Sequence, residues 1–270
     1  MNAKKVIGIS LLATGIGTAI YYLVARGRDI GIAEKQGRYL SFSTSYCMAG
    51  LNGSVQIDLP AISDAFYEDF DVPQNVEKMN QIRSQYGVIV SSIASLTNLP
   101  ESLIYSFIFI ESAGNAFAMN GKAIGLMQVS TTSATDIVYM EYKKGRLGSG
   151  ESAILRNYLG ARLDQILSMR SPGVLQVVTQ TDLYEPELNI LIGSILLGQL
   201  IDEHTENDVL RLDKVVVRYN VGYYSFGRGK NLIGDVLTVI GQVNPFTSSY
   251  ITKLIGRNGV LEMIESENCA

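Results

Sequence analysis

The sequence is poor in the residues that build metal and redox centres. Its 270 residues include one histidine, two cysteines and no tryptophan. A single histidine, His204, excludes a site with several histidine ligands, and the polar residues around it predict a solvated helix end. The two cysteines, Cys47 and Cys269, are too few for a disulfide framework and match no metal motif. We therefore expect unpaired thiols, no metal and no other cofactor.

The chain also lacks a basic excess. Its formal net charge is −4, whereas a surface that binds phosphates needs an excess of lysine and arginine. Nucleic acid is therefore not an expected partner. The basic residues that do occur gather at one end, because residues 1–38 contain six basic side chains and two acidic ones. This asymmetry indicates that the basic end and the acidic remainder have different roles.

One uncharged apolar stretch lies inside the basic end. Val6–Val24 contains nineteen residues without a formal charge, between Lys4-Lys5 and Arg26. A helix of about 20 apolar residues spans a bilayer, so residues 1–28 are predicted to form a transmembrane anchor. A cleaved signal peptide is the alternative, but the position two before Ala25 lacks the expected small residue. Both flanks are basic, so the orientation in the membrane stays open.

The next segment, residues 29–73, is predicted to be a linker followed by an acidic arm. Residues 41–54 are small and polar with scattered glycine, a composition typical of linkers. Residues 58–71 mix acidic and aromatic side chains, and their role stays open.

The rest of the chain shows helical patterning. Apolar residues from Val76 to Leu96 recur at steps of three and four. A second helix follows Pro100 and is expected to end at Gly114. Further helical patterns cover 151–168, 186–204, 208–219 and 247–255, and no segment alternates as strands do. We predict a mainly α domain over residues 74–258 and a C-terminal tail over 259–270.

Glu111 is the most informative residue. It follows the run Leu103–Ile110, which has almost no polar break. A helix that is apolar on every side is buried. Burial disfavours ionisation of a carboxyl group, so the pKa of Glu111 should rise towards the range that a general acid needs.

Glu111 also begins a series of short motifs that carry a family resemblance. They are Glu111–Asn115, Gly125–Val129, Pro186–Gly193, Val217–Gly222 and Thr247–Ile251. In this order they resemble the soluble lytic transglycosylase (SLT) family of the lysozyme superfamily, over about residues 75–256. The resemblance implies a lysozyme-like fold and an enzyme that cuts the glycan strands of peptidoglycan.

The resemblance also implies roles for individual residues. Glu111 would be the catalytic acid and base, and Tyr219 matches a tyrosine whose hydroxyl points at that glutamate. Ser112, Gln128 and Asn220 are expected on the substrate side of the site, with Met127 as an apolar wall. Structural interpretations stay open, namely a buried tyrosine bonded to backbone, a capping amide at Gln128, a core methionine, and turn or helix contacts for Asn220 and Asn189.

The sequence departs from the family pattern in its turns. The loop 118–124 is about one residue shorter than usual, Ala116 replaces a proline, and Ser130–Thr132 stands where another proline is expected. These changes affect loop shape and substrate preference more than the reaction. The fifteen tyrosines can supply sugar-stacking faces in the absence of tryptophan.

The leading hypothesis is a lytic transglycosylase held by its anchor at the cell wall or in a phage virion membrane. It would cut the MurNAc-GlcNAc β-1,4 bond and form 1,6-anhydromuramic acid with one glutamate. Two alternatives stay open. One is a lysozyme-type muramidase, which uses water. The other is a component of a virion or an envelope-spanning assembly that uses the domain mainly to dock on the wall.

Overall fold

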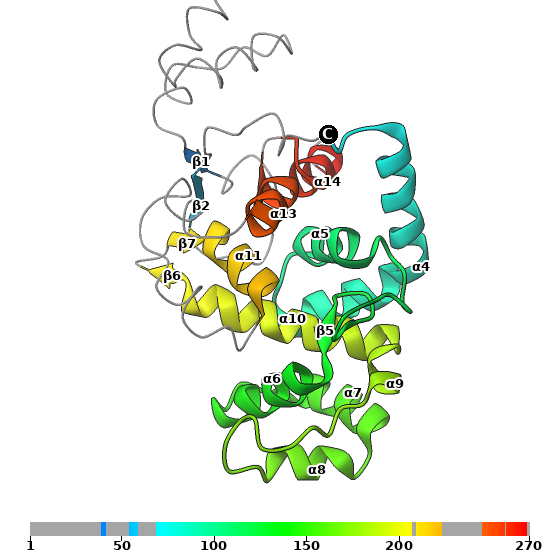
Figure 1. The fold of residues 1–270 in the computed structure, drawn as a ribbon, viewed down its shortest axis with the longest axis vertical. Coiled ribbons are helices and arrows are strands. Elements are labelled where there is room, and N and C mark those ends of the chain that lie inside the picture. Colours follow the sequence, from blue (N-terminus) through cyan, green and yellow to red (C-terminus); the bar gives the residue numbers. More distant parts are fainter. Residues whose placement is uncertain are drawn as a thin grey trace, which may run out of the picture.

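The computed structural model describes residues 39–41, 54–58, 69–206, 209–222, 245–256 and 258–268. The described chain is mainly helical, as predicted (Figure 1). Its helices are α4 (Pro73–Thr97), α5 (Glu101–Ser112), α6 (Thr131–Lys143), α7 (Ser149–Leu159), α8 (Arg162–Leu167), α9 (Gln180–Leu183), α10 (Pro186–Glu203), α11 (Leu212–Val221), α13 (Pro245–Ile255) and α14 (Val260–Asn268).

Helix α10 is the centre of the fold. It packs against α4, α6, α7, α9 and α11, and nearly every residue from Leu188 to Leu200 is buried. In Figure 1 it runs between the group formed by α6, α7 and α8 and the group formed by α5, α11, α13 and α14. A helix buried on all sides needs an apolar sequence all round, which α10 has. Pro186 begins it in the first turn, where proline is tolerated.

Helix α5 places Glu111 in its last turn. The helix packs against α4, α13 and α14, and residues 102–109 are buried. Ala113 ends it in a left-handed conformation, followed by Gly114 with φ +80°. A Cβ atom on Gly114 would lie 2.6 Å from Cγ1 of Ile82 on α4. The Tyr86 hydroxyl of α4 donates to the Gly114 carbonyl over 3.1 Å, so α4 fixes the end of the helix that carries Glu111.

Two small sheets complete the fold. One has the order β1 (Tyr39–Ser41), β2 (Ser54–Asp58), β7 (Val209–Arg211), β6 (Thr205–Glu206), with β2 parallel to β7. The other is the antiparallel set β3 (Met119–Asn120), β4 (Ala123–Ile124), β5 (Val129–Ser130). These strands are too short to show alternation in the sequence. Strands β1 and β2 lie within the range expected as linker and arm, and β2 joins that range to the domain.

Three helices were not expected from the sequence, namely α6, the short α9 and α14. Helix α6 begins just after Ser130, whose side chain accepts a hydrogen bond from the Ser133 amide. The Ser130–Thr132 segment is therefore a helix start rather than a proline turn. Helix α14 lies in the range expected as a tail, yet Val260, Leu261 and Ile264 are fully buried. It packs on α5 and α13.

The prediction for His204 was wrong. The residue ends α10 but is buried rather than solvated. The reason is that β7 folds back over the helix end, where the Arg211 amide donates to the His204 carbonyl over 3.0 Å. Burial lowers the pKa of His204 below its ordinary value.

The predicted anchor, Val6–Val24, lies outside the described residues, as do Cys47 and Cys269. Within the described ranges, no helix has the length and apolar character that crossing a bilayer requires.

Two glycines of α10 give opposite predictions for stability. A Cβ atom on Gly193 would lie 2.5 Å from Sδ and 2.8 Å from Cβ of Met127, whereas a Cβ on Gly198 would meet nothing within 4 Å. We expect Gly193→Ala to lower the free energy of unfolding by about 1–2 kcal/mol through overpacking. Gly198→Ala should raise it by up to about 1 kcal/mol through helix propensity. Urea denaturation of both variants measures this, and equal shifts would contradict the packing described.

Candidate active site

Glu111 has the environment expected of a general acid. It is partly buried at the end of a helix whose preceding turns are buried. Loss of hydration raises its pKa from 4.5 to about 7, and a hydrogen bond from Tyr250 opposes part of that rise. The expected upward shift of this pKa is therefore confirmed. Near neutral pH, the carboxyl group is poised between its acid and base forms.

The phenol that contacts Glu111 belongs to Tyr250 on α13. Its hydroxyl donates to Oε1 of Glu111 over 2.5 Å. Burial and then the charge of Glu111 raise the pKa of Tyr250 well above its ordinary value, so this group stays a donor. Tyr250 lies in the fifth motif, Thr247–Ile251, which had suggested the family but no role for the tyrosine.

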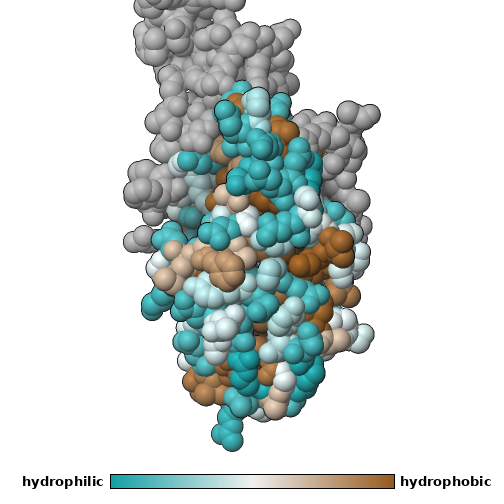
Figure 2. Space-filling view, turned by 90° about the vertical axis from the view of Figure 1, so that its right-hand side faces the viewer, coloured by the Kyte–Doolittle hydropathy of each residue, from teal (hydrophilic) through white to brown (hydrophobic). Residues whose placement is uncertain are grey.

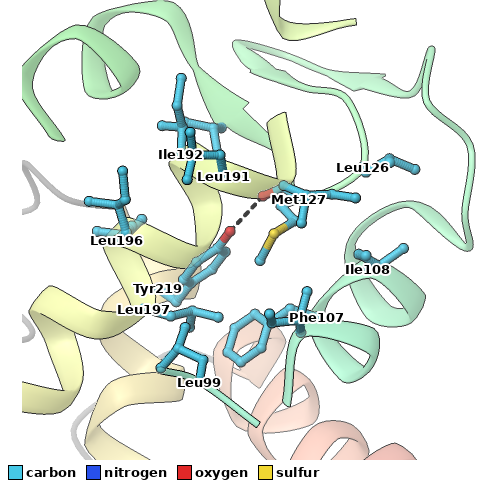
Figure 3. Packing of buried hydrophobic residues seen from close by; sticks show 14 of the residues in the cluster. Leu99, Phe107, Ile108, Leu126, Met127, Leu191, Ile192, Leu196, Leu197 and Tyr219 are labelled. Atoms are coloured by element: carbon cyan, nitrogen blue, oxygen red, sulfur yellow. Dashed lines mark hydrogen bonds between the residues drawn. The ribbon is translucent and has the colours of Figure 1, made fainter. Parts of the chain in front are cut away.

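Tyr219, which the resemblance aims at Glu111, bonds elsewhere. Its hydroxyl donates to the Met127 carbonyl over 2.8 Å, as Figure 3 shows. Its ring packs against Phe107 with centroids 4.5 Å apart. Burial and then the nearby charge of Glu111 raise the pKa of Tyr219 well above its ordinary value. Tyr219 thus lies within the electrostatic reach of the acid while it supports the Met127 peptide.

Met127 is held at both of its backbone groups. Its amide donates to Oδ1 of Asn189 over 2.8 Å, and its carbonyl accepts from Tyr219. The side chain is fully buried among apolar residues of α5 and α10 (Figure 3). Asn189 also donates through Nδ2 to the carbonyls of Ile124 and Leu183, over 2.9 and 2.8 Å. This buried amide therefore fixes the Gly125–Gln128 loop on α10.

The loop itself depends on an unusual backbone. Gly125 has φ +78°, and a Cβ there would lie 2.3 Å from both Nδ2 of Asn189 and the Leu183 carbonyl. Gln128 also adopts a positive φ, +48°. Its Nε2 donates to the carbonyls of Gly125 and Ala118 over 2.8 and 3.2 Å. The side-chain amide of Gln128 thus ties the Gly125–Gln128 turn to the preceding segment at Ala118.

The other two polar candidates also make contacts within the chain. Ser112 donates to the Ile108 carbonyl over 3.1 Å and accepts from the Gly114 amide over 3.2 Å. Asn220 is exposed, and its Oδ1 accepts from the Thr247 hydroxyl over 2.9 Å, which joins α11 to α13. These bonds hold the ends of the helices that carry Glu111 and Tyr219.

No protein-family model matches the chain. Over 74 residues it is 35% identical to the membrane-bound lytic murein transglycosylase E of Buchnera aphidicola subsp. Acyrthosiphon pisum (strain APS). The aligned stretch covers 27% of this chain and 34% of that protein, so the chain spans about a third of the length of the curated relative it matches. This similarity supports a relationship to lytic transglycosylases at the level of the family.

The raised pKa of Glu111 predicts a stability that depends on pH. The folded chain holds this proton more tightly than the unfolded chain, with a pKa of about 7 against 4.5. Ionisation therefore destabilises the fold as pH rises between these values, and the cost is absent at pH values below both. We expect Glu111→Gln to exceed the wild type in free energy of unfolding by roughly 1–3 kcal/mol at pH 8 and by little at pH 4.

Thermal unfolding of the full-length chain at pH 4, 6 and 8 measures this difference. Glu77→Gln is the matched control, because Glu77 is an exposed carboxylate on α4. A Glu111→Gln advantage that is the same at every pH would show that the fold does not perturb this carboxyl.

Proposed function

We propose that the chain is a peptidoglycan lytic transglycosylase that cuts the MurNAc-GlcNAc β-1,4 bond with Glu111 as acid and base. The observation that carries this proposal is the Glu111 carboxyl, whose pKa is about 7 and whose Oε1 accepts a hydrogen bond from Tyr250. The similarity to a lytic murein transglycosylase supports the same substrate class.

The proposed reaction uses one carboxyl twice. Protonated Glu111 gives its proton to the glycosidic oxygen, and the bond from that oxygen to C1 of MurNAc breaks. The 2-acetamido group of the same sugar stabilises the oxocarbenium-like state. The C6 hydroxyl then bonds to C1 and gives its proton to the Glu111 carboxylate. The products are a free 4-hydroxyl on GlcNAc, a 1,6-anhydromuramoyl end and protonated Glu111, and no water is consumed.

The surroundings of Glu111 fit a single-acid mechanism. Most glycosidases use two carboxylates, the second of which acts as a nucleophile or activates water. Among the residues that the structure describes, burial and the Tyr250 phenol shift the pKa of Glu111, and neither of these causes is another carboxylate. A hydroxyl supplied by the substrate takes the place of the second acid. This favours the transglycosylase over the muramidase alternative.

The remaining residues support the acid in this proposal. Tyr250 orients one carboxylate oxygen, and Tyr219 supports the peptide of Met127, whose side chain is a buried core residue rather than the apolar wall expected from the sequence. Ser112, Gln128 and Asn220 line the path of the glycan through the polar atoms that their internal bonds leave available. The predicted anchor, Val6–Val24, would hold the domain at a membrane that faces the wall or within a virion membrane.

Product analysis tests the reaction directly. Full-length protein and its Glu111→Gln variant are incubated with purified peptidoglycan, and the soluble muropeptides are identified by mass spectrometry. We expect anhydro-muropeptides from the wild type and a loss of at least about 100-fold in the variant, because general acid catalysis contributes about that much.

Other products would decide for the alternatives. Muropeptides that are one water heavier, with a reducing end, would make the protein a muramidase. A folded wild-type protein that binds the wall and releases nothing would make the domain a docking module.

The two tyrosines should differ in the pH dependence of turnover. Turnover requires protonated Glu111, so kcat should fall as pH rises through its pKa of about 7. Because the Tyr250 hydroxyl stabilises the carboxylate, Tyr250→Phe should move this fall to higher pH. Tyr219→Phe should reduce kcat by about tenfold, because the buried Met127 carbonyl loses its donor. The pH at which kcat falls should stay the same.

Kcat measured from pH 5 to 9 for both variants separates these effects. If both variants move the fall in kcat to the same extent, Tyr219 would contact Glu111 during turnover as Tyr250 does, and the distinction between the two tyrosines would be wrong.

A further inference from the structure

An aromatic platform is formed by two side chains of the loop that follows Glu111 and by one residue from the turn between α9 and α10. The platform consists of Phe117, Met119 and Tyr184. Phe117 is 73% exposed and Met119 is 59% exposed, and the rings of Phe117 and Tyr184 lie with centroids 5.5 Å apart. Large apolar side chains that gather at a surface mark an interaction site more often than scattered ones do.

Polar atoms stand at the edge of this platform. Nε2 of Gln180 donates to the Tyr184 hydroxyl over 2.6 Å and lies 3.5 Å from Sδ of Met119. An apolar face with an amide and a hydroxyl at its edge matches a sugar ring, whose C–H face is apolar and whose rim carries hydroxyls.

The loop holds Phe117 in place. The Phe117 amide donates to Oδ1 of Asn115 over 3.0 Å, and the Ala118 amide donates to the Asn115 carbonyl over 3.1 Å. The Ala118 carbonyl accepts from both the Gly125 amide and Nε2 of Gln128. An exposed ring on a fixed backbone loses little freedom on binding, which favours its use as a binding surface.

The platform is close to the acid along the chain. Phe117 is six residues beyond Glu111, and six residues of extended chain reach at most about 20 Å. A short oligosaccharide covers that distance. Phe117 and Met119 also lie in the segment where this sequence departs from the family pattern, with Ala116 in place of proline and one residue fewer before Gly125.

The size of the platform argues against a protein partner. A stable protein interface buries about 800 Å² on each side and involves some 20–30 residues, whereas here two rings and one thioether form the surface. Figure 2 shows the side of the molecule to the right in Figure 1, where apolar residues surface in separate patches between hydrophilic ones.

From these observations we propose that Phe117, Met119 and Tyr184 form a sugar-stacking subsite for a glycan strand whose scissile bond lies at Glu111. This subsite rests on the proposed function for the identity of the strand. Phe117 and Tyr184 support the apolar face of an N-acetylated sugar, and the polar side chain of Gln180 lies at its rim. The subsite positions the strand and does not take part in proton transfer.

Binding without cleavage tests the subsite. Full-length Glu111→Gln protein is titrated with peptide-free glycan strands prepared from purified peptidoglycan, with and without Phe117→Ala. We expect Phe117→Ala to raise Kd about five- to tenfold, as loss of one aromatic contact does. Phe117→Tyr should restore the affinity. Tyr142→Ala is the matched control, because Tyr142 is an aromatic on α6 that is 44% exposed, and it should leave Kd unchanged.

Cleavage by the corresponding single variants separates this inference from the proposed reaction. With Phe117→Ala we expect KM to rise by the same factor as Kd while kcat and its pH dependence stay unchanged. An unchanged Kd and KM in Phe117→Ala, alongside normal anhydro products, would overturn the subsite and leave the reaction standing. A raised Kd in a chain that cleaves nothing would uphold the subsite and reject the reaction. Equal losses in Tyr142→Ala would also overturn the subsite.

Discussion

The peptide group of Met127 is the point on which the site depends. Its amide is bound by Asn189 from α10 and its carbonyl by Tyr219 from α11. Three motifs that are far apart in the sequence therefore meet at one buried peptide. Each of these bonds is made away from water, where an unpaired partner is costly. Two glycines of these motifs are required by the same packing. A side chain on Gly125 would collide with Asn189, and one on Gly193 would collide with Met127.

The ionised form of Glu111 is destabilising in an otherwise well-packed domain. Apolar helix α5 brings Glu111 to a place where its charge is poorly solvated, and the Tyr250 hydroxyl offsets only part of that penalty. The same burial that raises the pKa to about 7 makes the ionised form less stable. The positive φ angles of Ala113 and Gly114 end α5 just after Glu111 and so set where its carboxyl lies.

The sequence predicted the elements that have strong periodicity or a distinctive start. Helices near Val76–Leu96, at Pro186 and around 247–255 were found within a few residues, and the raised pKa of Glu111 followed from its apolar helix. Helix α6 was missed because Ser130 acts as a cap where the family resemblance suggested a turn. The burial of His204 and the partner of each tyrosine hydroxyl depend on contacts between distant segments, which periodicity does not contain. The contact of Tyr250 with Glu111 is of this kind.

Helices α13 and α14 pack on α5 although they follow it by more than a hundred residues of chain. During synthesis, α5 leaves the ribosome long before Tyr250 and the apolar residues of α14 exist. The Tyr250 hydroxyl that donates to Glu111 is in place only when α13 has docked on α5. The surroundings of Glu111 therefore combine segments that lie far apart in the described chain, and they form only when those segments pack together.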